Sequence, residues 1–162
     1  MYIIDPSHSS IGFVVRHAMV TKVRGTFDEF EGTINREEPS ASVTVKTASI
    51  NTGNADRDGH VRNEDFFDVE KFPEMTFVTT GFDIDEIGNG TVTGDLTIKG
   101  ITKSIELKVQ DAAEFEDRFG FEATGTINRK DFGVDFNAPL KTGGLMLSED
   151  IKLEIEVSAV KQ

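Results

Sequence analysis

The chain has 162 residues, a length that suits one domain with a sizeable hydrophobic core. Hydrophobic residues make up 37% and charged residues 28%, a balance that excludes an intrinsically disordered chain. The net charge of −12 argues against a nucleic-acid partner, because phosphate binding requires clustered Lys and Arg.

The chain contains no cysteine, which excludes disulfides, thiolate nucleophiles and cysteine-ligated zinc. Its first residues, MYIIDPSHSSIGF, lack the basic segment, apolar stretch and cleavage site of a secretory signal, so we expect a cytoplasmic location. No apolar run approaches the roughly 20 residues that span a bilayer, and we expect no stable membrane insertion.

Three segments in the first third of the chain predict β-strands, because apolar and polar residues alternate as they do in a strand with one buried face. They are residues 9–19, 25–34 and 40–50. The middle segment, GTFDEFEGTI, has an interrupted phase that suggests a bulge. The apolar faces of the other two are Ile11, Phe13, Val15 and His17, and Val43, Val45 and Thr47.

The stretch ADRDGHVRNEDFFDVEKFP, residues 55–73, interrupts this alternation with crowded charges and the pair Phe66 and Phe67. Candidate helix caps precede it at Asn51 and Asn54, and Pro73 ends any helix before the next strand. The stretch therefore predicts a short helical insertion that crosses one end of the sheet.

Five further strands are predicted with the same alternation, at residues 74–82, 90–100, 103–109, 118–129 and 150–160. Their shared faces are Met75, Phe77 and Thr79; Val92, Gly94, Leu96 and Ile98; Ile105, Leu107 and Val109; Phe119, Phe121, Ala123, Gly125 and Ile127; and Ile151, Leu153, Ile155 and Val157.

A second irregular insertion, residues 132–150, carries Leu145, Met146 and Leu147. The two insertions are expected to close the ends of one barrel.

Eight strands with one apolar face and short turns predict an all-β protein with an antiparallel meander, as a single domain over residues 1–162. Closure into an eight-stranded barrel hides both the sheet edges and the apolar face, with a short helical insertion between strands 3 and 4. Such a barrel has room for side chains or one small elongated ligand. A two-sheet sandwich is the alternative. Gly94 and Gly125 favour the barrel, because they leave space where a packed sandwich needs bulk.

No motif for metal, cofactor or nucleophilic chemistry stands out. Carboxylates lie near His60, but no HExxH or paired-His spacing accompanies them, so we predict no metal site. There is no GxSxG motif, and GNGTVTGD lacks the Lys and the following helix of a phosphate-binding loop. We therefore predict no cofactor and no catalytic residue.

His17 and His60 each have two interpretations. His17 is either a core histidine with one satisfied hydrogen bond or a polar group that orients a ligand inside an apolar cavity. His60 either tethers the insertion to a strand end through a buried hydrogen bond or faces a ligand head group.

Four ordered sequence blocks resemble the YceI-like family of polyisoprenoid-binding proteins. They are DPSHSSIGFVVRHAMVTKVRGTFDEFEG, SINTGNADRDGHVRNEDFFDVEKFPEMTF, GDLTIKGITKSIEL and INRKDFGV, and the match runs nearly end to end. The resemblance implies an extended, lipocalin-like barrel that holds a long isoprenoid lipid or similar amphiphile. It also implies a homodimer, although no exposed apolar stripe in the sequence indicates one. Many members are periplasmic or secreted.

With this resemblance, residues 55–73 are interpreted as a lid in which Phe66 and Phe67 cover apolar surface. Arg57, Asp58, His60 and Arg62 would fix it through hydrogen bonds and ion pairs, and Arg57 or His60 would also meet a head group. The expected ligand contacts in the cavity are Phe13, Val15, His17, Phe66, Phe67, Phe77, Leu96, Ile98, Phe121, Leu153 and Ile155.

The predicted function is binding of the lipid for transport, storage or sequestration, without catalysis. Two alternatives stay open. One is a small barrel enzyme that acts on a hydrophobic substrate with His17 or His60 as acid–base group. The other is a filled barrel whose outer surface binds a protein.

Overall fold

The computed structural model describes residues 1–17, 21–135 and 147–162 of the chain. Within these residues the protein is almost entirely β-structure, with one α-helix and three single-turn 3-10 helices. The strands are β1 (Tyr2–Ile4), β2 (Ser10–His17), β3 (Thr21–Phe27), β4 (Phe30–Asn35), β5 (Ser40–Lys46), β6 (Ile50–Asn51), β7 (Glu74–Ile84), β8 (Gly90–Ile98), β9 (Ile101–Phe115), β10 (Arg118–Asn128) and β11 (Asp150–Lys161). The helices are η1 (Pro6–His8), η2 (Thr47–Ser49), α1 (Ala55–Arg62) and η3 (Arg129–Phe132).

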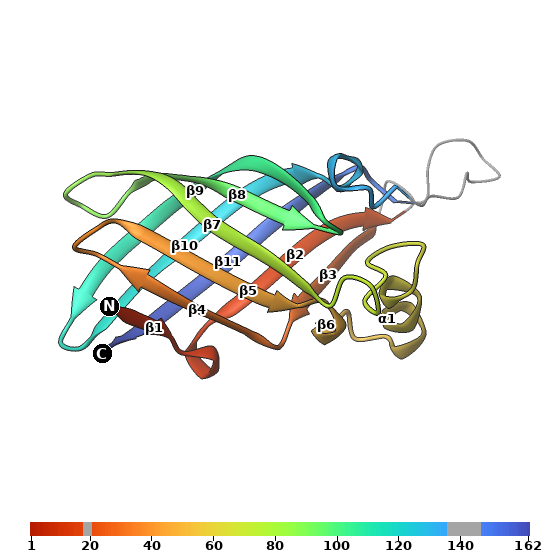
Figure 1. Ribbon diagram of the computed structural model, residues 1–162, viewed down its shortest axis with the longest axis horizontal. Coiled ribbons are helices and arrows are strands. Elements are labelled where there is room, and N and C mark those ends of the chain that lie inside the picture. The colour runs from red at the N-terminus through yellow and green to blue at the C-terminus, as the bar shows by residue number, and fades with distance from the viewer. Residues whose placement is uncertain (18–20, 136–146) are drawn as a thin grey trace.

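The strands form one antiparallel sheet that closes because β1 pairs with both β4 and β11. Three barrel strands are each broken into two segments: β1 and β2, β3 and β4, and β5 and β6. The pairings of β4 with β5 and of β3 with β6 show this continuity, as do those of β1 and β2 with β11. Eight strands therefore surround the axis in chain order, and α1 lies between the third and fourth (Figure 1). The predicted eight-stranded barrel is confirmed.

The two ends of the barrel differ. The chain termini and the hairpin turns after β4, β7 and β9 lie at one end, which we call the terminal end (Figure 1). The helix α1, the turn between β8 and β9 and η3 lie at the other, which we call the helix end.

The interruption expected in GTFDEFEGTI lies at Asp28 and Glu29, between β3 and β4. Their backbone groups pair outside the regular ladder: Asp28 N donates to Ser49 O (3.1 Å) and Glu29 O accepts from Lys46 N (2.9 Å). The break shifts the side-chain phase by one residue, so that both Phe27 and Phe30 face the barrel interior although their numbers differ in parity.

The space expected beside Gly94 and Gly125 is occupied, and that expectation was wrong. A Cβ atom at Gly94 would lie 2.5 Å from Cζ of Phe77, and one at Gly125 would lie 2.7 Å from Cδ2 of Leu107. The two glycines therefore let neighbouring side chains lie against the barrel wall rather than adding open volume.

Buried residues of β1, β4, β10 and β11 seal the terminal end: Tyr2, Ile4, Ile34, Phe119, Val157 and Ala159. The guanidinium of Arg36 lies over the ring of Phe119, with its Cζ 4.3 Å from the ring centroid. Nη1 of Arg36 is 2.9 Å from Oε2 of Glu114. The Tyr2 hydroxyl donates to the same carboxylate, which raises the pKa of Tyr2 above its usual value.

The described flanks of the second insertion do not reach the terminal end, which it was expected to close. These flanks, residues 132–135 and 147–150, lie at the helix end, the same end as α1 (Figure 1). Leu145 and Met146 lie outside the described residues. The barrel is therefore asymmetric along its axis, with buried residues at the terminal end and the described parts of both insertions at the helix end.

Asp5 links the start of the chain to the last two strands. Its carboxylate accepts from the hydroxyl of Ser7 (2.6 Å), from Nδ1 of His8 (2.8 Å) and from Nη1 of Arg118 (3.2 Å). These interactions, with the Ser7 hydroxyl foremost, hold the pKa of Asp5 well below its usual range.

Because Asp5 stays ionised in the folded protein at a pH that protonates it in the unfolded chain, it contributes stability above the unfolded pKa of about 3.9. The difference in free energy of unfolding between wild type and Asp5→Asn, present at pH 5, should shrink as pH falls below about 4. Urea denaturation at a series of pH values measures it. A difference that stays constant down to pH 2 would contradict this account.

Candidate ligand cavity

A cavity of about 390 Å³ lies inside the barrel, and we call it the barrel cavity. It reaches from Ile4 and Ile34, which are buried near the terminal end, to the exposed side chains of Arg57 and His60 at the helix end. The cavity is therefore closed at one end and reaches the surface at the other. Its volume lies in the range of about 300–1,000 Å³ typical of small-molecule sites.

The residues predicted to contact a ligand all line this cavity, together with Arg57 and His60. They come from five barrel strands and from the insertion: Phe13, Val15, His17, Phe66, Phe67, Phe77, Leu96, Ile98, Phe121, Leu153 and Ile155. The structure thus gathers them around one space, and their contact with a ligand stays a prediction.

Several of these side chains point into a closed barrel yet are only half-buried. Phe77, Phe121, Leu153 and Ile155 are examples, and each lies on the inner face of a barrel strand. In a filled core such residues would lose nearly all of their accessible surface. Here the remaining surface faces the cavity, which shows that opposite walls do not meet.

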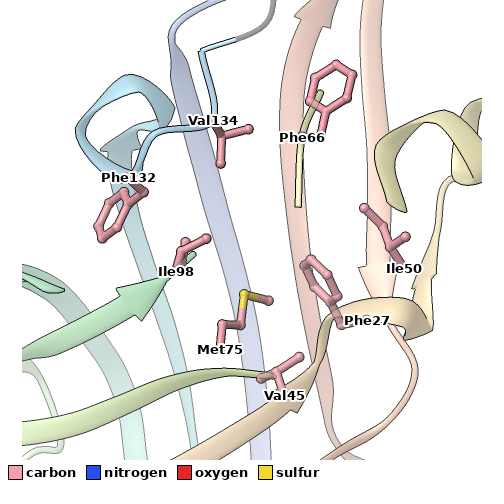
Figure 2. Packing of buried hydrophobic residues seen from close by; sticks show 8 residues of the cluster. All are labelled: Phe27, Val45, Ile50, Phe66, Met75, Ile98, Phe132 and Val134. Carbon is pink, nitrogen blue, oxygen red and sulfur yellow. The ribbon is translucent and has the colours of Figure 1, made fainter. Parts of the chain in front are cut away.

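The helix end of the cavity is narrowed by a cluster of buried apolar residues (Figure 2). They come from β3, β5, β6, β7, β8, from the insertion and from the η3 region: Phe27, Val45, Ile50, Phe66, Met75, Ile98, Phe132 and Val134. Phe67 packs edge-on against Phe27, with ring centroids 5.8 Å apart. Phe66 and Phe67 therefore cover apolar surface, as the lid interpretation expected.

Polar contacts fix α1 to the chain segment that precedes it. Asn54 caps the helix, and its Oδ1 accepts from Arg57 N (3.0 Å). Arg57 donates from Nε to Thr52 Oγ1 (2.9 Å) and from Nη2 to Thr52 O (2.8 Å). Arg62 donates to the carbonyl oxygens of Ala48 (2.9 Å) and Ile50 (3.2 Å), and buried Asp58 accepts from Thr52 N.

These contacts differ from the expectation in one respect, because both arginines bind neutral oxygens and, among the described residues, make none of the expected ion pairs. The charged partner of His60 also lies within the insertion: its Nε2 is 2.9 Å from Oδ2 of Asp65. That side chain is 45% exposed, so this contact is not the buried tether to a strand end that the sequence suggested.

The C-terminal end of the insertion is held at Thr47, which is almost fully buried. Its hydroxyl donates to Phe72 O (2.8 Å) and its amide to Pro73 O (3.0 Å). Among the described residues, the hydrogen bonds of segment 52–73 run only to residues 47–73. Apolar contacts, such as that of Phe67 with Phe27, join the lid to the barrel strands.

His17 ends β2 at the helix end and forms an isolated backbone bridge with Leu147, which also lines the cavity. The imidazole ring of His17 is half-buried and makes no hydrogen bond among the described residues. It therefore differs from a core histidine with one satisfied hydrogen bond. The geometry therefore leaves the ring accessible from the cavity.

Arg129 is a cavity residue that the sequence did not single out. It is 5% exposed and lines the cavity, and its guanidinium donates to Ser148 O (2.9 Å) and Val134 O (2.7 Å). Burial lowers its pKa from the usual value, and the carboxylates of Glu149 and Asp135 oppose that shift. The only signal in the sequence is the block INRKDFGV, in which nothing distinguishes Arg129 from exposed Lys130.

Among the described residues, no three His, Asp or Glu side chains converge as metal ligands would. None of the described helices is long and apolar enough to cross a membrane.

Comparison with known proteins identifies the fold family. The model of the YceI-like domain matches residues 2–159. The chain belongs to the YceI-like family. UPF0312 proteins from several Staphylococcus aureus strains are 40% identical to this YceI-like chain, over 94% of it and 93% of their own length.

Solved structures share the barrel. A Campylobacter jejuni YceI protein is 32% identical with a TM-score of 0.77, covering 91% of this chain and 90% of that one. Burkholderia cenocepacia BcnA is 23% identical with a TM-score of 0.85, covering 97% and 99%. A polyisoprenoid binding domain from Saccharophagus degradans is 18% identical with a TM-score of 0.78, covering 99% and 98%. The latter two similarities show the fold alone.

Proposed function

We propose that this YceI-like protein binds a long-chain isoprenoid lipid or a similar amphiphile in the barrel cavity, for transport, storage or sequestration. The observation that carries the proposal is the half-buried state of inward-facing apolar side chains around an open interior. The description of the Saccharophagus degradans domain as polyisoprenoid binding supports the same ligand class.

The energetics of burial favour a long tail. Each buried methylene contributes about 0.8 kcal/mol, so a dozen contribute roughly 10 kcal/mol. Association costs about 4–15 kcal/mol in lost freedom, which a short chain does not offset. The preformed cavity keeps that cost low, because barrel strands rather than loops hold its walls.

The asymmetry of the barrel supports one direction for the bound ligand. The terminal end is sealed by buried residues such as Tyr2 and Phe119, so the tail would point towards it. The charged side chains of the cavity wall lie at the helix end, where the head group would remain near water. Entry would then require displacement of the lid. A cytoplasmic location and a homodimer stay predictions.

Extraction of the purified protein with organic solvent, followed by mass spectrometry, tests the proposal. We expect a prenyl lipid or another long amphiphile in the extract, or saturable uptake of an added polyprenol by protein stripped of lipid. Absence of both would contradict lipid binding and would favour a barrel whose outer surface binds a protein.

The enzymatic alternative has its own test in the double variant His17→Gln, His60→Gln. Under the binding proposal this variant still retains lipid, and incubation with wild type leaves the lipid chemically unchanged. Conversion of the lipid by wild type, lost in the double variant, would instead establish an enzyme.

A further inference from the structure

The barrel cavity excludes acidic side chains from its wall. The chain has 29 Asp and Glu residues, yet none of the described ones lines the cavity. Residues 18–20 and 136–146, which the structure does not describe, contain neither residue type in their sequence. The charged or titratable residues that do line the cavity are His17, Arg57, His60 and Arg129. A chain of net charge −12 therefore presents positive or neutral groups to its ligand.

These four residues are not spread along the cavity. His17 ends β2, Arg57 and His60 lie on α1, and Arg129 begins η3, all at the helix end (Figure 1). The wall towards the terminal end is lined by hydrocarbon side chains such as Ile4, Ile34 and Val157. The cavity therefore has one cationic end and one apolar end, as a site for an amphiphile with a charged head would have.

Arg57 has capacity for a further ligand. Its Nε and Nη2 groups donate to Thr52, whereas Nη1 has no acceptor among the described residues. The side chain forms no ion pair with any described carboxylate. The contacts with Thr52 hold the guanidinium in place, so that an anion at the cavity mouth would meet an oriented donor.

Arg129 adds a fixed positive charge to the same end. Its guanidinium is buried and held by backbone carbonyl oxygens, so the charge cannot move away from the cavity. A charge in a low-dielectric wall acts over a longer range than one in water. The carboxylate of Asp65 faces His60, and Asp58 is occupied by Thr52, so neither lies in the cavity wall.

We propose that the amphiphile bound by this protein carries an anionic head group, a phosphate ester or a carboxylate, which binds at the helix end in direct contact with Arg57. This inference rests on the proposed lipid-binding function and names the chemistry of the head group. A neutral head group would accept only weaker hydrogen bonds from the cationic wall, whereas an anion would be stabilised by charge-assisted hydrogen bonds.

Three probes with long apolar tails test this in wild-type protein stripped of lipid: geranylgeranyl phosphate, a C20 fatty acid and geranylgeraniol. We expect the phosphate and the carboxylate to bind about tenfold more tightly than the alcohol of comparable tail, which is a difference of about 1.4 kcal/mol. Isothermal titration gives the three dissociation constants. If only the phosphate binds more tightly than the alcohol, the head group of the natural ligand is a phosphate ester. If the fatty acid also binds more tightly than the alcohol, free fatty acids are ligands of the same site.

Arg57→Gln should weaken binding of both anions roughly fivefold, the effect of losing one partly exposed ion pair, and leave the alcohol unaffected. Arg57→Lys should restore part of the loss. Lys71→Gln is the matched control, because Lys71 is an exposed residue of the same insertion that does not line the cavity. It removes the same charge and should change none of the three affinities.

Two outcomes would overturn the inference while leaving the proposed function intact. One is equal affinity of the wild-type protein for the alcohol and the anions. The other is an equal loss of affinity for all three probes in Arg57→Gln. The second result would mean that Arg57 acts only by holding the lid. If no probe binds to wild-type protein, lipid binding itself fails, and the two proposals are thereby distinguished.

Discussion

Replacement of Phe132 by alanine is expected to lower the free energy of unfolding by about 3–5 kcal/mol, the usual cost of deleting a buried phenyl ring. Phe132 is 1% exposed and belongs to the apolar cluster at the helix end (Figure 2). It lies on η3, which Asn128 caps by accepting from Lys130 N (2.9 Å). Neither the capped turn nor the barrel strands around it can move inward to close the hole, so little of the cost would be recovered.

The matched control for this prediction is Phe115→Ala. Phe115 ends β9 at the terminal end and is 76% exposed, so the same substitution should change the free energy of unfolding by less than about 0.5 kcal/mol. Urea denaturation with equal m-values for the three proteins measures both effects. Similar losses in the two variants would show that Phe132 is not part of a packed cluster.

Replacement of Ile155 by tryptophan is expected to reduce lipid retention more than tenfold while the melting temperature stays at or above that of wild type. Ile155 lies on β11 between Ala123 of β10 and Ile11 of β2, and its half-buried surface faces the middle of the cavity. An indole ring would occupy space that the tail needs. Because the accessible surface of Ile155 faces the cavity, we expect filled volume rather than strain.

Glu156→Trp is the control, because Glu156 is the next residue of β11 and points to the outside of the barrel. It should retain lipid as wild type does. Mass spectrometry of solvent extracts gives the retained lipid, and thermal unfolding gives the melting temperature. If Ile155→Trp fails to fold, Leu153→Phe adds less volume on the same face. Wild-type retention in a folded cavity variant would mean that the lipid does not lie in the barrel.

The sequence alone determined the main strands, though not β1, and the inward-facing side wherever the alternation is unbroken. Alternation is a local property, because successive side chains of a strand point to opposite faces whatever the rest of the chain does. Residues such as Phe13, Phe77 and Leu153 could therefore be assigned to the interior from alternation alone, and four sequence blocks sufficed to indicate the family.

Positions where the local period breaks were harder to assign. Phe30 faces inward only because Asp28 and Glu29 shift the phase, and the register shift between Thr79 and Gly81 does the same for Phe82. A bulge depends on the pairing of one strand with its neighbour, so a single strand carries only a weak sign of it.

Only the tertiary structure decided whether the interior is empty or filled, and what lies at its mouth. The gap between opposite walls depends on the number of strands and on their stagger around the barrel, which are properties of closure. The same holds for Arg129, which is buried although its neighbour Lys130 is exposed, and for the two insertions, whose described parts lie at one end. The positions of Arg129 and of the insertions depend on contacts between segments that are distant in the sequence. The local pattern of residues does not predict those contacts.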